Sequence, residues 1–190
     1  HLGHFIENNR VQHALLQQVK YSDNIDLIIG EQLQSLRYQP GTLNVNTDQQ
    51  EYNCSLLVAC DGANSTVRGL LDIAVKRHEY LQRCIVGTVK FDGNHQQTAW
   101  QRFIKSGPLG MLSLSAQHAS LAWSCDNARA EALLQLDETA FIERLQNVVG
   151  DRFGNITAIQ QRASFPLASQ QAKSYIAPRV ALVGDAAHSI

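Results

Sequence analysis

The chain has 190 residues, of which 44% are hydrophobic and 17% charged, and its formal net charge is −1. This composition is typical of a globular protein and excludes a disordered chain. No basic run is present, so we expect no nucleic-acid partner. No apolar stretch reaches the roughly 18 residues that a membrane-spanning helix needs. The four cysteines are widely spaced and form no Cys-x-x-Cys pair, so we expect no metal site.

The first 50 residues predict a helix, a strand and a hairpin. Residues 8–20 have apolar positions at helical spacing, which predicts an amphipathic helix. The apolar run at 25–29 predicts a strand that ends at a glycine. Residues 31–38 and 42–47 flank Pro40-Gly41, a turn signal, and therefore predict a β-hairpin.

An apolar run at residues 55–60 predicts a strand buried on both faces, because it is short and bounded by turn signals. Asp61-Gly62 follows it and favours a turn, since glycine tolerates backbone conformations that other residues resist. Asn64 or Ser65 is suited to cap a short helix that carries Arg68. The segment thus places an acidic residue and a glycine at the carboxyl end of a strand.

The last residues repeat this arrangement. Residues 179–183 predict a buried strand, and Gly184-Asp185 leads into the first turn of a helix. Ligands of open α/β sheets gather at the carboxyl ends of strands, and a helix N-terminus attracts anions. We therefore expect Asp61 and Asp185 to converge on one ligand, and we expect the chain to be a piece of a larger nucleotide-binding protein.

The middle of the chain has a different pattern. Short strands separated by turn signals predict an antiparallel sheet rather than βαβ units. A helix is predicted at 137–149, with Asp137 as its N-cap and Gly150 as its stop, and an extended piece is predicted to end at Pro166. The predicted strands of this block cover residues 84–91, 98–104, 110–114 and 119–125.

The fold class that follows is α/β, or α+β overall. We predict that residues 1–70 form part of a nucleotide-binding domain with a Rossmann-like sheet. Residues 71–177 form a mostly antiparallel, β-rich domain that interrupts it, and residues 178–190 return as its last strand. A crevice between two such domains is a common ligand site.

Four stretches carry a resemblance to a known family: residues 3–16, 57–68, 101–109 and 165–188. Together they resemble the flavin-dependent aromatic hydroxylases of the p-hydroxybenzoate hydroxylase type, and within that group the ubiquinone-biosynthesis branch. That family begins with a Gly-x-Gly-x-x-Gly unit that cradles the FAD pyrophosphate, and this chain contains no such sequence. We therefore expect residues 1–190 alone to hold FAD weakly and to be inactive.

The resemblance implies an FAD-binding domain interrupted by a substrate-binding domain. It implies a monooxygenase that uses NAD(P)H and O₂ to hydroxylate a prenylated phenol in ubiquinone biosynthesis, through a flavin hydroperoxide. The implied partners are a small hydrophobic phenol and other quinone-biosynthesis proteins. The implied location is cytoplasmic, with peripheral association with the membrane.

The resemblance also assigns the cofactor contacts to Asp185, Gly184, Asp61, Gly62, Arg68 and Asn8. Each has an ordinary alternative. Asp185 could cap the final helix, and Arg68 could pair with pyrophosphate or with Asp61. Asn8 could lie on a solvated helix face.

The implied substrate contacts are Arg102, Phe103, Pro108 and Leu109, for which ordinary sheet packing is the alternative. The resembled chemistry belongs to the cofactor, so no catalytic side chain is assigned. Two other functions stay open: a flavoprotein of the same superfamily that acts on a different aromatic or isoprenoid compound, and a non-catalytic module of a biosynthetic complex.

Overall fold

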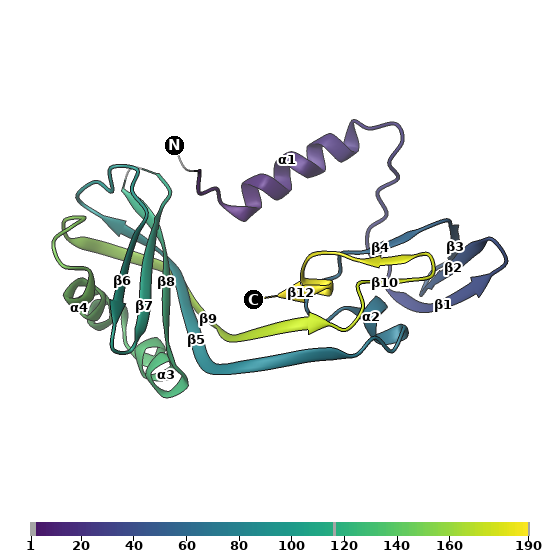
Figure 1. The fold of residues 1–190 in the computed structure, drawn as a ribbon. Helices are drawn as coiled ribbons and strands as arrows, with labels where there is room; N and C mark the ends of the chain where they lie inside the picture. The colour runs from purple at the N-terminus through teal and green to yellow at the C-terminus, as the bar shows by residue number, and fades with distance from the viewer. Residues whose placement is uncertain (1–2, 116, 190) are drawn as a thin grey trace. The chain divides into compact units, whose positions relative to one another are not determined.

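The computed structural model describes residues 3–115 and 117–189. The chain divides into two compact units, each of which is discontinuous in sequence (Figure 1). Residues 22–80 and 168–190 form one, which we call the motif unit because it contains both acidic-glycine pairs. Residues 1–21 and 81–167 form the other, which we call the helix-covered unit.

An antiparallel meander opens the motif unit. It consists of β1 (Leu33–Gln39), β2 (Thr42–Thr47) and β3 (Glu51–Cys54). The predicted hairpin is confirmed, since β1 and β2 pair antiparallel around the Pro40-Gly41 turn. Leu43 of β2 is fully buried and fixes which face of the meander joins the core.

A second small sheet of this unit consists of β4 (Leu57–Ala59), β10 (Ile176–Ala177) and β11 (Val180–Leu182). Strand β11 lies in the middle, antiparallel to β10 and parallel to β4. Helix α2 (Thr66–Leu70) follows β4, and the 3₁₀ turn η1 (Gly184–Ala186) follows β11. Their inward side chains form one apolar cluster, whose buried members include Ala59, Val67, Val180, Leu182 and Ala186.

The largest sheet has six strands: β5 (Val75–Phe91), β6 (Trp100–Ile104), β7 (Gly107–Ser113), β8 (His118–Asp126), β9 (Ile156–Ala172) and β12 (His188–Ser189). Their order is β12-β9-β5-β8-β7-β6. Strands β5 and β9 have 17 residues each, and both run from one unit into the other. The four predicted middle strands are therefore confirmed: 84–91 is part of the longer β5, and the other three correspond to β6, β7 and β8.

Helices α3 (Asn127–Gln135) and α4 (Glu138–Val149) pack on one face of this sheet. Strand β8 alternates strictly, and its inward residues Trp123 and Cys125 are buried against the helices. The predicted limits of α4 are confirmed, because the Asp137 carboxylate accepts a bond from the backbone N–H of Ala140 and Gly150 follows the last turn.

Helix α1 (Asn8–Lys20) begins and ends as predicted, but it buries none of its residues. The predicted strand at 25–29 is wrong. This segment forms no strand, and Ile25 and Ile29 are exposed, because no described strand pairs with it.

Strand β4 exists as predicted, but it is not buried on both faces. Val58 is 49% exposed and Leu56 57% exposed, because no part of the described chain covers that side of the strand. The predicted helix after Asp185 is a 3₁₀ turn, closed by the bond from Ala187 N–H to the Gly184 carbonyl, and β12 then pairs with β9.

Helix α3 was not predicted, and the extended piece does not stop at Pro166 but continues within β9 to Ala172. Proline is tolerated in a strand where the ladder needs no donor. The predicted fold class is confirmed: the chain is mixed α/β with mostly antiparallel sheets. Within the described residues, no helix combines the length and the apolar character that crossing a bilayer requires.

Candidate functional site

Parallel pairing of β4 and β11 brings the two acidic-glycine pairs to the same edge of their sheet. Leu182 lies opposite Ala59, and the backbone N–H of Val183 donates to the Ala59 carbonyl at 2.9 Å. Because the strands run in the same direction, Asp61 and Asp185 both follow the carboxyl ends. Both aspartates are exposed.

Arg68 joins the two segments directly. Its guanidinium donates through Nη1 to the carbonyl of Ala186 at 2.9 Å and through Nη2 to the carbonyl of Ala63 at 2.7 Å. Arg68 is only 8% exposed, so both bonds are shielded from water. The side chain therefore ties the loop after Asp61 to the turn that contains Asp185, rather than pairing with Asp61 itself.

Asp61 organises the start of α2. Its Oδ2 accepts a bond from the backbone N–H of Val67 at 3.1 Å, while Ser65 Oγ accepts one from the backbone N–H of Arg68 at 3.1 Å. A cap by Asn64 or Ser65 was predicted, and the structure shows that it is Ser65. Partial burial by itself raises the pKa of Asp61, but hydrogen bonds from the Ser65 hydroxyl and from the Val67 N–H outweigh it. The pKa of Asp61 therefore lies below its ordinary value of 3.8.

We expect Asp61→Asn to lower the free energy of unfolding at pH 7 by roughly 0.5–1 kcal/mol, a small effect because the group is partly solvated. A lowered pKa in the folded state means that the ionised carboxylate stabilises the fold above pH 3.8. That contribution is lost as the pH falls through the folded-state pKa. Urea unfolding of both proteins between pH 7 and pH 3 should show the gap closing on acidification. A gap that stays constant would show that the charge is not responsible.

Gly62 and Gly184 leave open space beside the aspartates. Their φ values are +81° and +60°, and a β-carbon at either position would meet no atom within 4 Å. None of the residues that the structure describes donates a hydrogen bond to the Asp185 carboxylate. This edge of the sheet therefore offers accessible backbone and an unused acceptor for the hydroxyl groups of a ligand.

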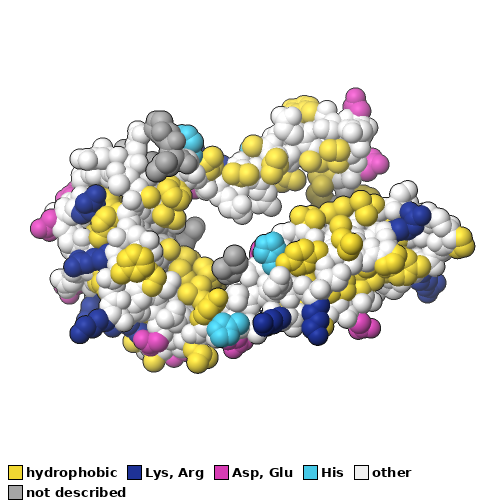
Figure 2. Space-filling model, in the orientation of Figure 1, with side chains coloured by type: hydrophobic (Ala, Val, Ile, Leu, Met, Phe, Trp, Pro, Cys, Tyr) yellow, Lys and Arg dark blue, Asp and Glu magenta, His cyan; other side chains and the backbone are white. Residues whose placement is uncertain are grey.

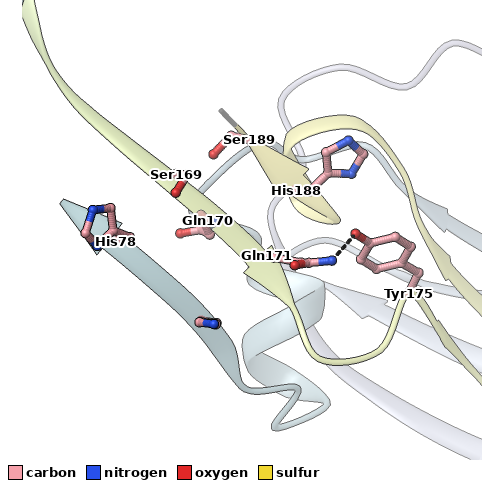
Figure 3. Close-up of a pocket in the computed structure, with 8 residues that line it drawn as sticks. His78, Ser169, Gln170, Gln171, Tyr175, His188 and Ser189 are labelled. Carbon is pink, nitrogen blue, oxygen red and sulfur yellow. Dashed lines mark hydrogen bonds between the residues drawn. The ribbon is translucent and has the colours of Figure 1, made fainter. Parts of the chain in front are cut away.

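A pocket of about 510 Å³ lies in the same unit (Figure 3). The Tyr175 and His188 rings stack with centroids 5.8 Å apart, and the Gln171 amide donates to the Tyr175 hydroxyl at 3.1 Å. Gln170 also links this pocket to the loop after Asp61, because its amide donates to the Ala63 carbonyl at 2.7 Å. The pocket is lined by Lys76, His78, Ser169, Gln170, Gln171, Tyr175, His188 and Ser189.

Sequence reasoning missed this pocket. Its lining comes from the beginning of β5, the end of β9, Tyr175 before β10, and β12, and no recognisable motif marks the first two segments. The one available signal was His188, three residues after Asp185.

The remaining predicted site residues lie in the helix-covered unit. Asn8 is exposed at the start of α1 in this unit, whereas Asp61 belongs to the motif unit. Arg102 donates to the carbonyl of Val148 at the end of α4, and Leu109, which is opposite Arg102, is fully buried in the core. Phe103, by contrast, is 79% exposed.

Phe103 pairs across the strands with Pro108. Pro108 borders a second pocket, of about 360 Å³, together with residues of β6, β7 and β8. The four predicted substrate contacts are therefore divided, because only Phe103 and Pro108 are directed away from the helices.

Comparison with known proteins gives consistent results. A protein of Synechocystis, slr1300, is 35% identical and matches 98% of this chain and 46% of its own length. The 3-demethoxyubiquinol 3-hydroxylase of Escherichia coli is 31% identical and matches 100% of this chain and 48% of its own length. The chain thus spans about half the length of the curated relatives it matches. The crystal structure of pqsL from Pseudomonas aeruginosa, a probable FAD-dependent monooxygenase, superposes with a TM-score of 0.79 at 21% identity and covers 95% of this chain and 52% of its own.

The sequence from residue 12 to residue 190 matches the family described as the FAD binding domain. This match covers nearly the whole chain and includes the segments after β4 and β11 that Arg68 connects. The resemblance inferred from the sequence motifs is therefore confirmed, and the chain belongs to the FAD binding domain family.

Proposed function

We propose that this chain is part of an FAD-dependent monooxygenase that hydroxylates a prenylated phenol in ubiquinone biosynthesis. The observation that carries the proposal is the joining of two acidic-glycine segments by parallel strands and by Arg68. The 31% identity to a ubiquinol hydroxylase supports the substrate class.

The residues at the edge of the sheet fit the cofactor. FAD carries hydroxyl groups and a pyrophosphate, and Asp185 supplies an exposed carboxylate with no partner among the described residues. Gly62 and Gly184 leave the adjoining backbone uncovered. We infer that Asp185 accepts hydrogen bonds from cofactor hydroxyls, while Arg68 acts as a positioning residue because both of its bonds are used within the protein.

Bound FAD would supply the redox chemistry, with NAD(P)H as the reductant and O₂ as the second substrate. The contribution of the chain is to hold and orient its ligands. Tyr175 and His188, whose rings stack on each other, line the pocket of Figure 3, and Gln171 fixes the orientation of Tyr175. Aromatic side chains suit contact with a planar ring system.

We assign substrate contacts to the β-rich block 71–177, and within it to Phe103 and Pro108 rather than to Arg102 and Leu109. Phe103 is exposed, and Pro108 borders a pocket with more apolar than polar surface. A prenylated phenol partitions into bilayers, so we place the protein in the cytoplasm at the membrane surface, in contact with other quinone-biosynthesis proteins.

The protein expressed from the complete gene tests this proposal. We expect it to purify with the visible absorbance of bound flavin, or to gain it on reconstitution with FAD. A prenylated phenol should then accelerate NAD(P)H oxidation, and mass spectrometry should find one labelled oxygen atom in the product when labelled O₂ is supplied. An unprenylated phenol is the matched control.

Two results would contradict the proposal in different ways. A protein that takes up no flavin would remove the cofactor assignment altogether. A flavoprotein that oxidises NAD(P)H without transferring oxygen would instead favour another reaction on the same fold, because one fold hosts many chemistries.

A further inference from the structure

A separate cavity lies in the helix-covered unit, at the place where α3 and α4 pack against β8. Its volume is about 350 Å³, which is within the range of small-molecule sites. Its polar and cationic lining consists of Trp123, Arg129, Arg144 and Asn147, and its apolar lining includes Leu136 and Val148. None of the site residues discussed above lines it.

The charged side chains of this cavity are both cationic. Arg129 on α3 and Arg144 on α4 are exposed, and neither guanidinium has a hydrogen bond or an ion pair to any residue that the structure describes. The acidic residues of the same helices, Glu131, Glu138 and Glu143, do not belong to the lining. Figure 2 shows several Lys and Arg side chains, in dark blue, on the surface of this unit.

Trp123 adds a buried donor without a partner. The side chain is 1% exposed, and its indole Nε1 has no hydrogen-bond partner among the described residues. The ring packs edge-on against Phe141, with centroids 6.1 Å apart, so its position is fixed by the core. Because Nε1 has almost no accessible surface, Trp123 contributes its ring to the wall of the cavity and not a donor to the ligand.

We propose that this cavity binds an amphiphilic anion, which means a carboxylate or phosphate group attached to an apolar chain. Arg129 and Arg144 bind the anionic group, because guanidinium groups match the geometry of both oxyanions. The Trp123 side chain forms part of the cavity wall. The chain of the ligand lies along Leu136 and Val148. This site is independent of the flavin chemistry proposed above.

Decanoate is the probe, and decanol is its uncharged control. The full chain carrying Trp100→Phe reports binding through the fluorescence of Trp123, and calorimetry gives the stoichiometry. We expect saturable binding of one decanoate per chain, and decanol should bind at least about tenfold more weakly. Equal affinity for the two probes would overturn the proposal.

Variants locate the site. Arg129→Gln and Arg144→Gln should each weaken decanoate binding by about tenfold, while Arg37→Gln, which changes an exposed arginine of the motif unit, should have no effect. Trp123→Phe keeps an aromatic ring in the wall, so it should leave the preference for decanoate over decanol unchanged. If Arg37→Gln acts as strongly as the other two, the attraction is not specific to the cavity.

Two further probes separate the sources of the anion. Decyl phosphate should bind with an affinity similar to that of decanoate, which would show that the site accepts either anionic group on an apolar chain. Inorganic phosphate should bind far more weakly because it lacks the chain. Vesicles that contain phosphatidylglycerol test surface attraction. The proposal is contradicted if the protein does not bind decanoate and if Arg129→Gln still binds these vesicles. The attraction would then be a nonspecific contact with the membrane surface.

Discussion

Replacing Arg68 with methionine is expected to lower the free energy of unfolding of the motif unit by about 3 kcal/mol. The variant keeps most of the side-chain volume but loses both bonds of the guanidinium, to the carbonyls of Ala186 and Ala63. The bond to Ala186 is buried and the bond to Ala63 is partly buried, so water replaces them poorly. Urea unfolding monitored by circular dichroism measures the loss. In the protein expressed from the complete gene, FAD affinity should fall about tenfold or more, because the turn after β11 is no longer tied in place.

Two controls accompany this change. Arg37→Met removes an exposed arginine without bonds to the site and should leave both stability and flavin binding unaltered. Arg68→Lys keeps the charge but can satisfy the two carbonyls less well than the guanidinium, so we expect an intermediate loss. If Arg68→Met were as stable as the parent, the bonds from Arg68 to Ala63 and Ala186 would not be what stabilises the contact between the two segments.

Asp185→Ala is expected to weaken FAD binding while leaving the free energy of unfolding nearly unchanged. Its carboxylate is exposed and has no partner among the described residues, so stability should change by less than about 0.5 kcal/mol. Under the proposed function, the same carboxylate binds cofactor hydroxyls. Loss of a charge-assisted hydrogen bond should therefore weaken FAD binding by about 10- to 100-fold. Titration of the apoprotein with FAD, followed by flavin fluorescence, measures this change.

The comparison that decides the role of Asp185 is with Asp26→Ala. Asp26 is an exposed aspartate of the same unit, and it should bind no cofactor. Equal flavin affinity in Asp185→Ala and Asp26→Ala would refute the assignment of Asp185. A large loss of stability in Asp185→Ala would point instead to a structural role in the turn.

The sequence predicts well those features that depend on neighbouring residues. The cap of α2 by Ser65 and the cap of α4 by Asp137 are both present, because an N-cap needs only a short polar side chain before a helical segment. The hairpin around Pro40-Gly41 follows from turn chemistry in the same way. The matching acidic ends of the two strands predicted that Asp61 and Asp185 converge, and the parallel pairing of β4 with β11 places both at the same edge of the sheet.

Features that depend on distant partners could not be predicted in the same way. The segment 25–29 has the composition of a strand, but composition does not supply a neighbour to pair with. The role of Arg102 depends on the end of α4, 46 residues away. The pocket around Tyr175 and His188 depends on two long strands that meet after separate paths through the chain.

Helix α3 was missed for a different reason. Its apolar residues are weakly periodic, so the search for an amphipathic pattern passed over it. Local preference nevertheless favours the helix, because most of its residues are strong helix formers and Asp126 caps it. Packing against β8 adds to this by burying Ala130 and Leu133 in the core.

The bond from Arg68 to Ala186 spans 118 residues of sequence. On the ribosome, the segment after β4 must therefore wait until the end of this region has been synthesised before its arginine finds its second acceptor. The intervening strands and helices can assemble during that interval, since their pairings are more local. The edge of the sheet that carries Asp61 and Asp185 is then completed late in biogenesis. Nascent chains stalled before β11 would present this edge to chaperones in an incomplete form.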